Sequence, residues 1–149
     1  MGPQAGLEAR GYRHFMKSMQ EEGLRLIQEA EGILKRDAQG ALNDKDFNMV
    51  VRRAQEVVEL TLKGALKILG VDYPKVHDVA PLFSEQVRQK AILKEPKILQ
   101  RIEEISLWLA QARIPSFYFD REYGAEDTEQ AFQDAVFVLT EVKKLLGDL

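Results

Sequence analysis

The chain has 149 residues, a net charge of −3 at pH 7 and no cysteine. This length fits one domain, and a chain of this size buries about 70% of its unfolded surface without a metal or a disulfide. The missing cysteine excludes disulfides, thiolate zinc sites and a cysteine nucleophile, and the acidic balance argues against a general DNA-binding surface. The chain has no signal-peptide core, and Glu59 and Lys63 interrupt its longest apolar run. We therefore expect a cytoplasmic protein that does not enter a membrane.

The N-terminal third predicts one long helix after a flexible start. Residues 1–11 contain three glycines and a proline without periodicity, so they predict a flexible segment. Apolar residues at helical spacing then predict a helix over 12–36, which Gly23 and Gly32 weaken by up to ~1 kcal/mol each unless they pack tightly against a neighbour. Residues 37–46 read as a turn-rich break between helices.

The segment 47–69 predicts the central helix of a bundle. Its apolar residues cover about half of the helical circumference, which is wide enough to contact more than one neighbour. Asp44 and Asp46 precede it as candidate N-caps, and Gly70 is a favourable C-terminal stop. The opposite side is polar and carries both signs of charge, on Arg52, Arg53, Glu56, Glu59, Lys63 and Lys67.

Three further helices follow. A short helix is predicted over 79–91, where Asp78 is a candidate N-cap and Pro81 falls in the first turn. A long helix is predicted over 96–112, and an aromatic loop over 113–126. The capping-box spacing of Asp127 and Gln130 then predicts the start of the last helix. These elements predict an all-α fold, a single domain built as an up-and-down antiparallel bundle of four long helices and one shorter helix.

The motifs of most enzyme classes are missing from the sequence. It has no glycine-rich phosphate loop, no His-Glu-x-x-His, no Glu-x-x-His pair and no serine in a nucleophile elbow. It contains two histidines and no cysteine, which makes a structural metal site improbable. We therefore assign no catalytic residue, no metal ligand and no cofactor from the motifs.

Two blocks of sequence carry a family resemblance. The first joins Arg53-Ala54-Gln55-Glu56, Glu59 with Lys63, an apolar run to Gly70, and Pro74-Lys75-Val76-His77-Asp78. The second joins Trp108-Leu109-Ala110-Gln111-Ala112-Arg113, then Ser116-Phe117-Tyr118, then an acidic loop that enters the last helix. In this order the blocks resemble the HEPN family (higher eukaryotes and prokaryotes nucleotide-binding domains), over about residues 13–146.

The resemblance implies a helical bundle that pairs as a homodimer. It also implies a partner, since many small family members act beside a minimal nucleotidyltransferase, often as toxin and antitoxin. Other members are metal-independent ribonucleases that carry an arginine, four to six residues, and then a histidine. Neither His14 nor His77 has an arginine at that distance upstream, which puts ribonuclease activity in doubt.

The candidate ligand-binding residues lie in the two matched blocks: Arg53, Glu56, Lys63, His77, Asp78, Arg113 and Tyr118. In the functional interpretation they share a groove in which cations bind a phosphate or an acidic partner and Tyr118 stacks on a base. In the structural interpretation the charges form solvent-facing i,i+4 pairs worth ~0.2–0.5 kcal/mol each. His77 then bonds locally, Asp78 caps a helix, and Tyr118 covers one end of the bundle.

The leading hypothesis is a HEPN-type protein that binds a nucleotide, RNA or a partner and works with a minimal nucleotidyltransferase. One alternative is a ribonuclease that uses His77 with Arg53 or Arg113 across a dimer interface. Another is a purely structural bundle with no ligand.

Overall fold

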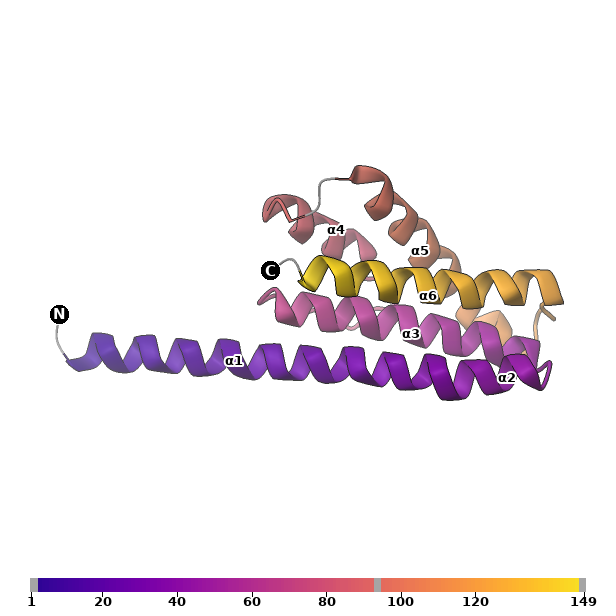
Figure 1. Cartoon of the computed structure of the whole chain (residues 1–149), viewed down its shortest axis with the longest axis horizontal. Helices are drawn as coiled ribbons and strands as arrows, with labels where there is room; N and C mark the ends of the chain where they lie inside the picture. Colours follow the sequence, from indigo (N-terminus) through magenta and orange to yellow (C-terminus); the bar gives the residue numbers. More distant parts are fainter. Residues whose placement is uncertain (1–2, 93–94, 148–149) are drawn as a thin grey trace.

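The computed structural model of the chain describes residues 3–92 and 95–147, which form an all-α bundle (Figure 1). The described residues contain no strand. The elements are α1 (Pro3–Gly32), the π-helical segment η1 (Ile33–Ala38), α2 (Gln39–Asn43), α3 (Phe47–Ile68), α4 (Ala80–Gln89), α5 (Pro96–Tyr118) and α6 (Ala125–Gly147). With α1, η1 and α2 in series and α4 short, the predicted architecture of four long helices and one shorter helix is confirmed.

The first helix is longer at both ends than the sequence indicates. It begins at Pro3, so the prediction of a flexible segment up to residue 11 is wrong for the described part, and residues 1–2 lie outside the described residues. The predicted break at 37–46 is also wrong except at its end, because η1 and α2 continue the helix to Asn43. Ala38 and Ala41 are buried there, so packing outweighs the turn preference of the glycine and asparagine nearby.

The turn before α3 closes the preceding helix with backbone hydrogen bonds. Lys45 N–H donates to the Leu42 carbonyl at 3.1 Å, and Asp46 N–H donates to the Ala41 carbonyl at 2.9 Å. Lys45 takes the left-handed conformation (φ 57°) that this motif requires. Asp46 occupies the predicted N-cap position of α3, but its side chain makes no capping hydrogen bond.

Helix α3 is the centre of the bundle, as predicted, and it contacts every other helical element. Its apolar arc is buried against these neighbours. Gly70 ends the helix as expected: its φ is 80°, its N–H donates to the Lys67 carbonyl, and the Val71 N–H donates to the Leu66 carbonyl, both at 2.9 Å.

Helix α1 packs on α3 through two glycines. A Cβ on Gly23 would lie 2.5 Å from the Gly64 carbonyl oxygen, and a Cβ on Gly64 would lie 2.6 Å from the Gly23 carbonyl oxygen. The two backbones are therefore in direct contact, which explains why a helix interior contains Gly23. Gly32 has nothing within 4 Å of an added Cβ, so tight packing does not explain it.

Helix α5 continues past its predicted end. It runs through Pro115 to Tyr118, so the prediction of a loop from residue 113 is wrong for its first six residues. Pro115 removes one helical N–H, but the last turn is held by other bonds. The Ser116 hydroxyl donates to the Arg113 carbonyl at 2.9 Å, and the buried Asn48 amide of α3 donates to the Ser116 carbonyl at 3.3 Å.

Helix α6 begins two residues before the predicted N-cap. Thr128 N–H donates to the Gly124 carbonyl at 3.1 Å, which makes Gly124 the residue before the first turn, so the prediction of Asp127 as N-cap is wrong. Asp127 instead lies in the first turn, where a carboxylate complements the helix dipole. Farther along α6, the buried Asp134 carboxylate accepts from Arg101 at 2.8 Å and from the Trp108 indole at 3.0 Å, which joins α6 to α5.

Across residues 3–92 and 95–147, every helix is too short or too polar to cross a lipid bilayer.

Candidate functional site

A polar network centred on Glu59 joins α3 to the loop before α4. The Glu59 carboxylate accepts from the Gln55 amide at 2.8 Å, from the Lys63 ammonium at 2.7 Å, and lies 2.8 Å from Nδ1 of His77. The Glu59 side chain is 16% exposed and the His77 side chain is 54% exposed. The carboxylate is therefore enclosed by three partners, while the imidazole ring reaches solvent.

Burial alone raises the pKa of the Glu59 carboxyl, because a charged group loses hydration in the protein. Hydrogen bonds from Lys63, Gln55 and His77, together with the positive charge of Lys63, more than offset this effect. The pKa of Glu59 consequently lies below its ordinary value of 4.5, and the group is an acceptor at neutral pH.

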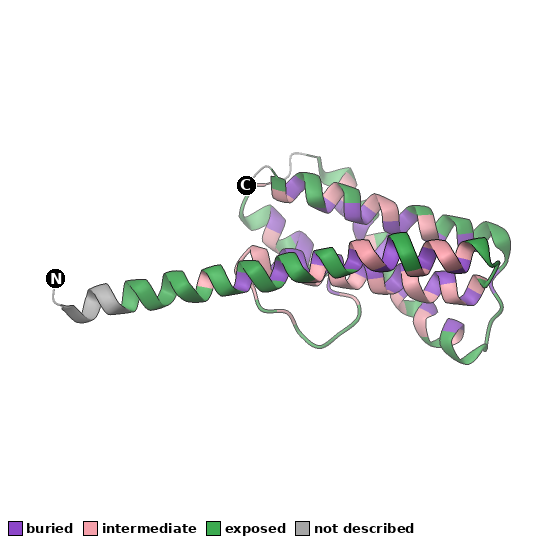
Figure 2. Cartoon of the chain, turned by 60° about the horizontal axis from the view of Figure 1, so that its bottom comes forward, coloured by how far each residue is buried: buried purple, intermediate pink, exposed green. Residues whose placement is uncertain are grey.

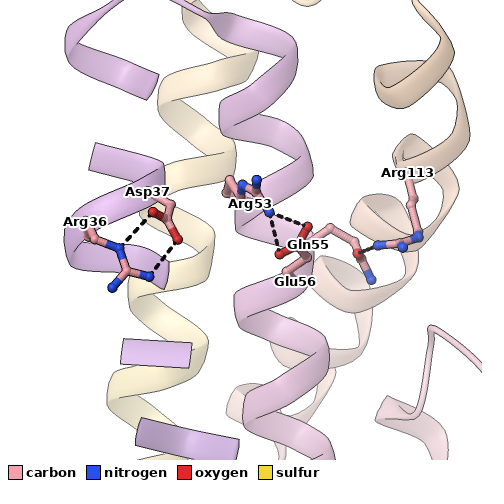
Figure 3. Close-up of polar contacts among 6 residues, drawn as sticks. All are labelled: Arg36, Asp37, Arg53, Gln55, Glu56 and Arg113. Atoms are coloured by element: carbon pink, nitrogen blue, oxygen red, sulfur yellow. Dashed lines mark hydrogen bonds and ion pairs between the residues drawn. The ribbon is translucent and has the colours of Figure 1, made fainter. Parts of the chain in front are cut away.

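The network extends from Gln55 to α5. Arg113 donates from one guanidinium nitrogen to the Gln55 side-chain oxygen at 2.7 Å (Figure 3). Three hydrogen bonds in series thus connect Arg113 to His77 through Gln55 and Glu59. The structure brings together three of the predicted site residues, Lys63, His77 and Arg113.

Arg53 and Glu56 form a separate pair on α3, one helical turn before Glu59. One guanidinium nitrogen of Arg53 is 3.0 Å from each carboxylate oxygen of Glu56. In Figure 3 this pair lies between the Arg36–Asp37 ion pair of η1 and the Gln55–Arg113 contact. The pair is thus apart from the Glu59 network, and each member satisfies the other.

Asp78 has a structural environment. Its carboxylate accepts from the Ala80 backbone N–H at 3.2 Å and from the Ser106 hydroxyl at 2.7 Å. The first bond satisfies the first backbone N–H of α4, but the N-cap position is Val79, so the prediction of Asp78 as N-cap is wrong by one residue. The second bond joins the loop to α5. His77, in contrast, contacts Glu59 rather than a residue near it in sequence.

Aromatic side chains surround the C-terminal turns of α5. Arg113, Ile114, Phe117 and Tyr118 line a hollow of about 210 Å³. The Phe117 and Tyr118 rings meet edge to face with centroids 5.0 Å apart, and the guanidinium of Arg52 lies 4.2 Å from the Phe117 centroid. Tyr118 is 67% exposed.

Two arginines beside this hollow have no acidic partner. Within residues 3–92 and 95–147, Arg113 makes its hydrogen bond to the neutral Gln55 and Arg52 makes a cation–π contact, and neither forms an ion pair. A guanidinium has five N–H donors, so both retain donors for an anion. Arg52 and Arg113 therefore place uncompensated positive charge near Phe117, since Arg52 lies over its ring and Arg113 lines the same hollow.

Three residues of this site were not among the predicted ligands. Gln55 and Glu59 belong to the matched sequence block, but their roles depend on contacts with α5 and the loop before α4. Gln55 leaves a signal in the sequence, since it is a polar residue at i+4 from Val51 of the apolar arc. In the structure it is 2% exposed. Arg52 leaves no signal in the sequence, because its partner Phe117 falls in the segment that the sequence predicts as a loop.

The described residues contain no group of three or more acidic or histidine side chains arranged to hold a metal ion.

The fold and this network define a class: an α-helical bundle whose central helix carries a connected polar site against the helix before last. A family model for the HEPN domain matches residues 20–145, nearly the whole bundle. The chain belongs to the HEPN domain family, as its two sequence blocks indicate. No curated protein and no solved structure matches the chain.

Proposed function

We propose that this HEPN-family chain binds a nucleotide or the end of an RNA at the hollow beside Arg113. The observation that carries the proposal is the pair of arginines without acidic partners, Arg52 over the Phe117 ring and Arg113 in the lining of the same hollow. Guanidinium groups bind phosphate through paired donors, and exposed aromatic rings stack on bases. Tyr118 is the ring placed for stacking, because Arg52 already covers one face of Phe117.

The Glu59 network supports this role by fixing Arg113. Gln55 is buried and is itself hydrogen-bonded to Glu59, so the Arg113 guanidinium is held in one orientation before a ligand binds. A preorganised donor loses less conformational entropy when the ligand binds. Among the predicted ligands, Arg113 and Tyr118 contact the anion and the base in this proposal, and Lys63 and His77 belong to the support.

Calorimetric titration of ATP and of a short single-stranded RNA into the full chain tests the proposal. Replacing Arg113 or Arg52 by alanine removes a charged hydrogen-bond donor, which is worth about 1.5–3 kcal/mol and corresponds to roughly tenfold to more than hundredfold weaker binding. Arg88→Ala is the matched control, because Arg88 is exposed and paired with Glu103 at 3.3 Å. Binding that Arg113→Ala leaves unchanged would place the ligand elsewhere, and no heat with either ligand would reject the proposal.

The family resemblance supports two further parts of the proposal: pairing of two copies and action beside a minimal nucleotidyltransferase, in the manner of a toxin and its antitoxin. Co-expression with a nucleotidyltransferase encoded next to this chain tests the second part. We expect the two proteins to elute together. Separate elution would reject the partnership and leave the nucleotide titration as an independent result.

The environment of His77 favours a ribonuclease as a second candidate. A carboxylate at 2.8 Å from Nδ1 orients the ring, and this arrangement is typical of a histidine that moves protons. Incubating RNA with the wild-type chain and with His77→Ala tests it. Equal and negligible cleavage by both proteins would exclude this activity.

A further inference from the structure

The first part of α1 projects beyond the rest of the bundle. Figure 1 shows its N-terminal turns extending past the ends of α3 and α6, and residues 8–18 are exposed except for the half-buried Met16 (Figure 2). The family match begins at residue 20, so this projection is an addition to the HEPN domain. We refer to residues 3–19 as the arm. Its seventeen helical residues span about 26 Å.

The apolar stripe of α1 continues along the arm past its last contacts with the bundle, where Met19 is buried and Met16 lies against Gly70. Met19 and Gly23 face α3, and at helical spacing the same stripe continues through Phe15 and Tyr12. Phe15 is 57% exposed and Tyr12 is 65% exposed. Two large aromatic side chains in water, in line with a buried stripe, indicate a surface that packs against another molecule.

The arm is also basic. It carries Arg10, Arg13 and Lys17 against a single carboxylate, Glu8. The opposite charge lies at the far end of the bundle, where residues 119–129 carry five carboxylates and one arginine. The arm and this segment lie at opposite ends of the long axis in Figure 1.

A cavity of about 420 Å³ opens in that acidic end. Its apolar walls are Trp108, Ala112, Pro115 and Tyr123, and its carboxylates are Asp120 and Asp127. Trp108, Ala112 and Pro115 follow each other at i, i+4 and i+7, so they share one face of α5. Arg113 and Phe117 lie on another face, which separates the cavity from the proposed nucleotide site.

The cavity already holds a cation of this chain. The guanidinium of Arg121 lies 4.8 Å from the Tyr123 ring centroid and 3.5 Å from the Asp127 carboxylate. The Arg121 and Asp127 side chains are both more than half exposed, so an incoming cation reaches the Asp127 carboxylate. The Tyr123 ring is only 6% exposed and lines the cavity beside Arg121, which leaves Trp108 and Pro115 as the accessible apolar wall. The combination of aromatic wall and carboxylate suits a segment that presents an aromatic ring next to a basic residue.

We infer that this cavity receives the arm of a second copy of the chain. Phe15 or Tyr12 packs on the apolar wall, and Arg13 and Lys17 face Asp120 and Asp127. Because the arm and cavity lie at opposite ends, a twofold axis perpendicular to the long axis lets each copy insert its arm into the other and closes the dimer. The inference rests on the proposed pairing of two copies and adds the surfaces that perform it; it does not depend on the nucleotide site.

A charge exchange between the two surfaces tests this arrangement. One variant carries Arg13→Glu and Lys17→Glu on the arm, and the other carries Asp120→Lys and Asp127→Lys in the cavity. Each variant alone sets like charges against each other in its own dimer, which we expect to weaken the dimer by about tenfold or more. A mixture of the two restores both pairs of opposite charges, so at a concentration where each variant alone is mainly monomeric we expect the mixture to form dimers. Light scattering on a sizing column gives the mass of each sample.

The controls separate this dimer from other arrangements. Lys35→Glu with Lys97→Glu makes the same charge change at exposed sites outside both surfaces, and we expect a dimer of wild-type affinity. Circular dichroism checks that every variant keeps its helices. The inference is overturned if the wild type is a monomer or if the mixture stays monomeric. It is equally overturned if either charge variant alone dimerises with the affinity of the wild type. In that case the contact between arm and cavity would not hold the dimer together. In every variant, the titration of ATP reports separately on Arg52 and Arg113.

Discussion

Glu59 connects the loop before α4 to α5 through a chain of hydrogen bonds. Its carboxylate contacts Gln55, Lys63 and His77, and Gln55 passes the connection to Arg113. Because the group is largely buried, its charge is tolerated only while these partners remain in place. Changing it should therefore alter the stability of the fold and its dependence on pH.

We predict that Glu59→Gln lowers the free energy of unfolding at pH 7 by about 1–3 kcal/mol, because it removes charged hydrogen bonds to Lys63 and His77. The pKa of Glu59 is depressed below 4.5 in the folded protein, so the folded state binds this proton less readily than the unfolded state. Its contribution to stability is present above pH 4.5 and is lost as the pH falls below that value through the folded-state pKa.

Urea denaturation at several pH values between 7 and 3 measures this effect. The wild type should lose more stability than the glutamine variant as the pH falls over that window. Glu56→Gln is the matched control, since Glu56 lies on the same helix and pairs with Arg53 alone. Parallel pH profiles for wild type and Glu59→Gln would show that the Glu59 charge does not stabilise the fold.

The candidate site was only partly predictable at the scale of residues. Lys63, His77 and Arg113 come from sequence blocks that the family resemblance joins, and the structure links them. Arg53 and Glu56 share those blocks but pair with each other, which the family pattern does not encode. Arg52 could not be found, because its significance lies in the ring of Phe117, and that ring is placed by the continuation of α5 through Pro115.

At the scale of elements, the boundaries that the sequence predicts incorrectly are those set by tertiary contacts. Gly40 and Asn43 favour a turn, yet the buried Ala38 and Ala41 keep that segment helical. Pro115 disfavours a helix interior, yet Asn48 and Ser116 support the last turns of α5. The end of α3 was predictable because Gly70 acts locally, through its own left-handed conformation.

The contact between α1 and α3 gives a prediction for its glycines. Gly23→Ala should destabilise the protein by about 1–3 kcal/mol or more, because the new Cβ would lie 2.5 Å from a backbone oxygen and the two helices must separate. Gly32→Ala should instead stabilise it by about 0.5–1 kcal/mol, since its surroundings are open and its φ of −64° is helical.

Urea denaturation measures the free energy of unfolding of both variants. It compares the same glycine-to-alanine substitution at a packed position and at an open position of α1. Gly64→Ala should resemble Gly23→Ala, because it meets the same contact from the other side. If Gly23→Ala were as stable as Gly32→Ala, the close approach of the two backbones would not exist in solution.

At the scale of the whole molecule, the bundle depends on α3 as its shared neighbour. Helix α3 contacts α1, α4, α5 and α6, whereas α4 packs mainly on α5 and α3. A defect in the interior of α3 therefore affects several interfaces at once. Leu62 is the natural place to make one, because it is completely buried near the middle of this helix.

We predict that Leu62→Ala lowers the free energy of unfolding by about 2–5 kcal/mol, through lost apolar contact and the cavity left behind. Leu107→Ala is the control: Leu107 is 49% exposed, so its loss should change stability by no more than ~0.5 kcal/mol. In urea, a lower midpoint with an unchanged slope would mean that the bundle still unfolds as one unit around α3. A smaller slope, or different midpoints for helix content and Trp108 fluorescence, would mean that α5 unfolds separately and that α3 does not hold the molecule together.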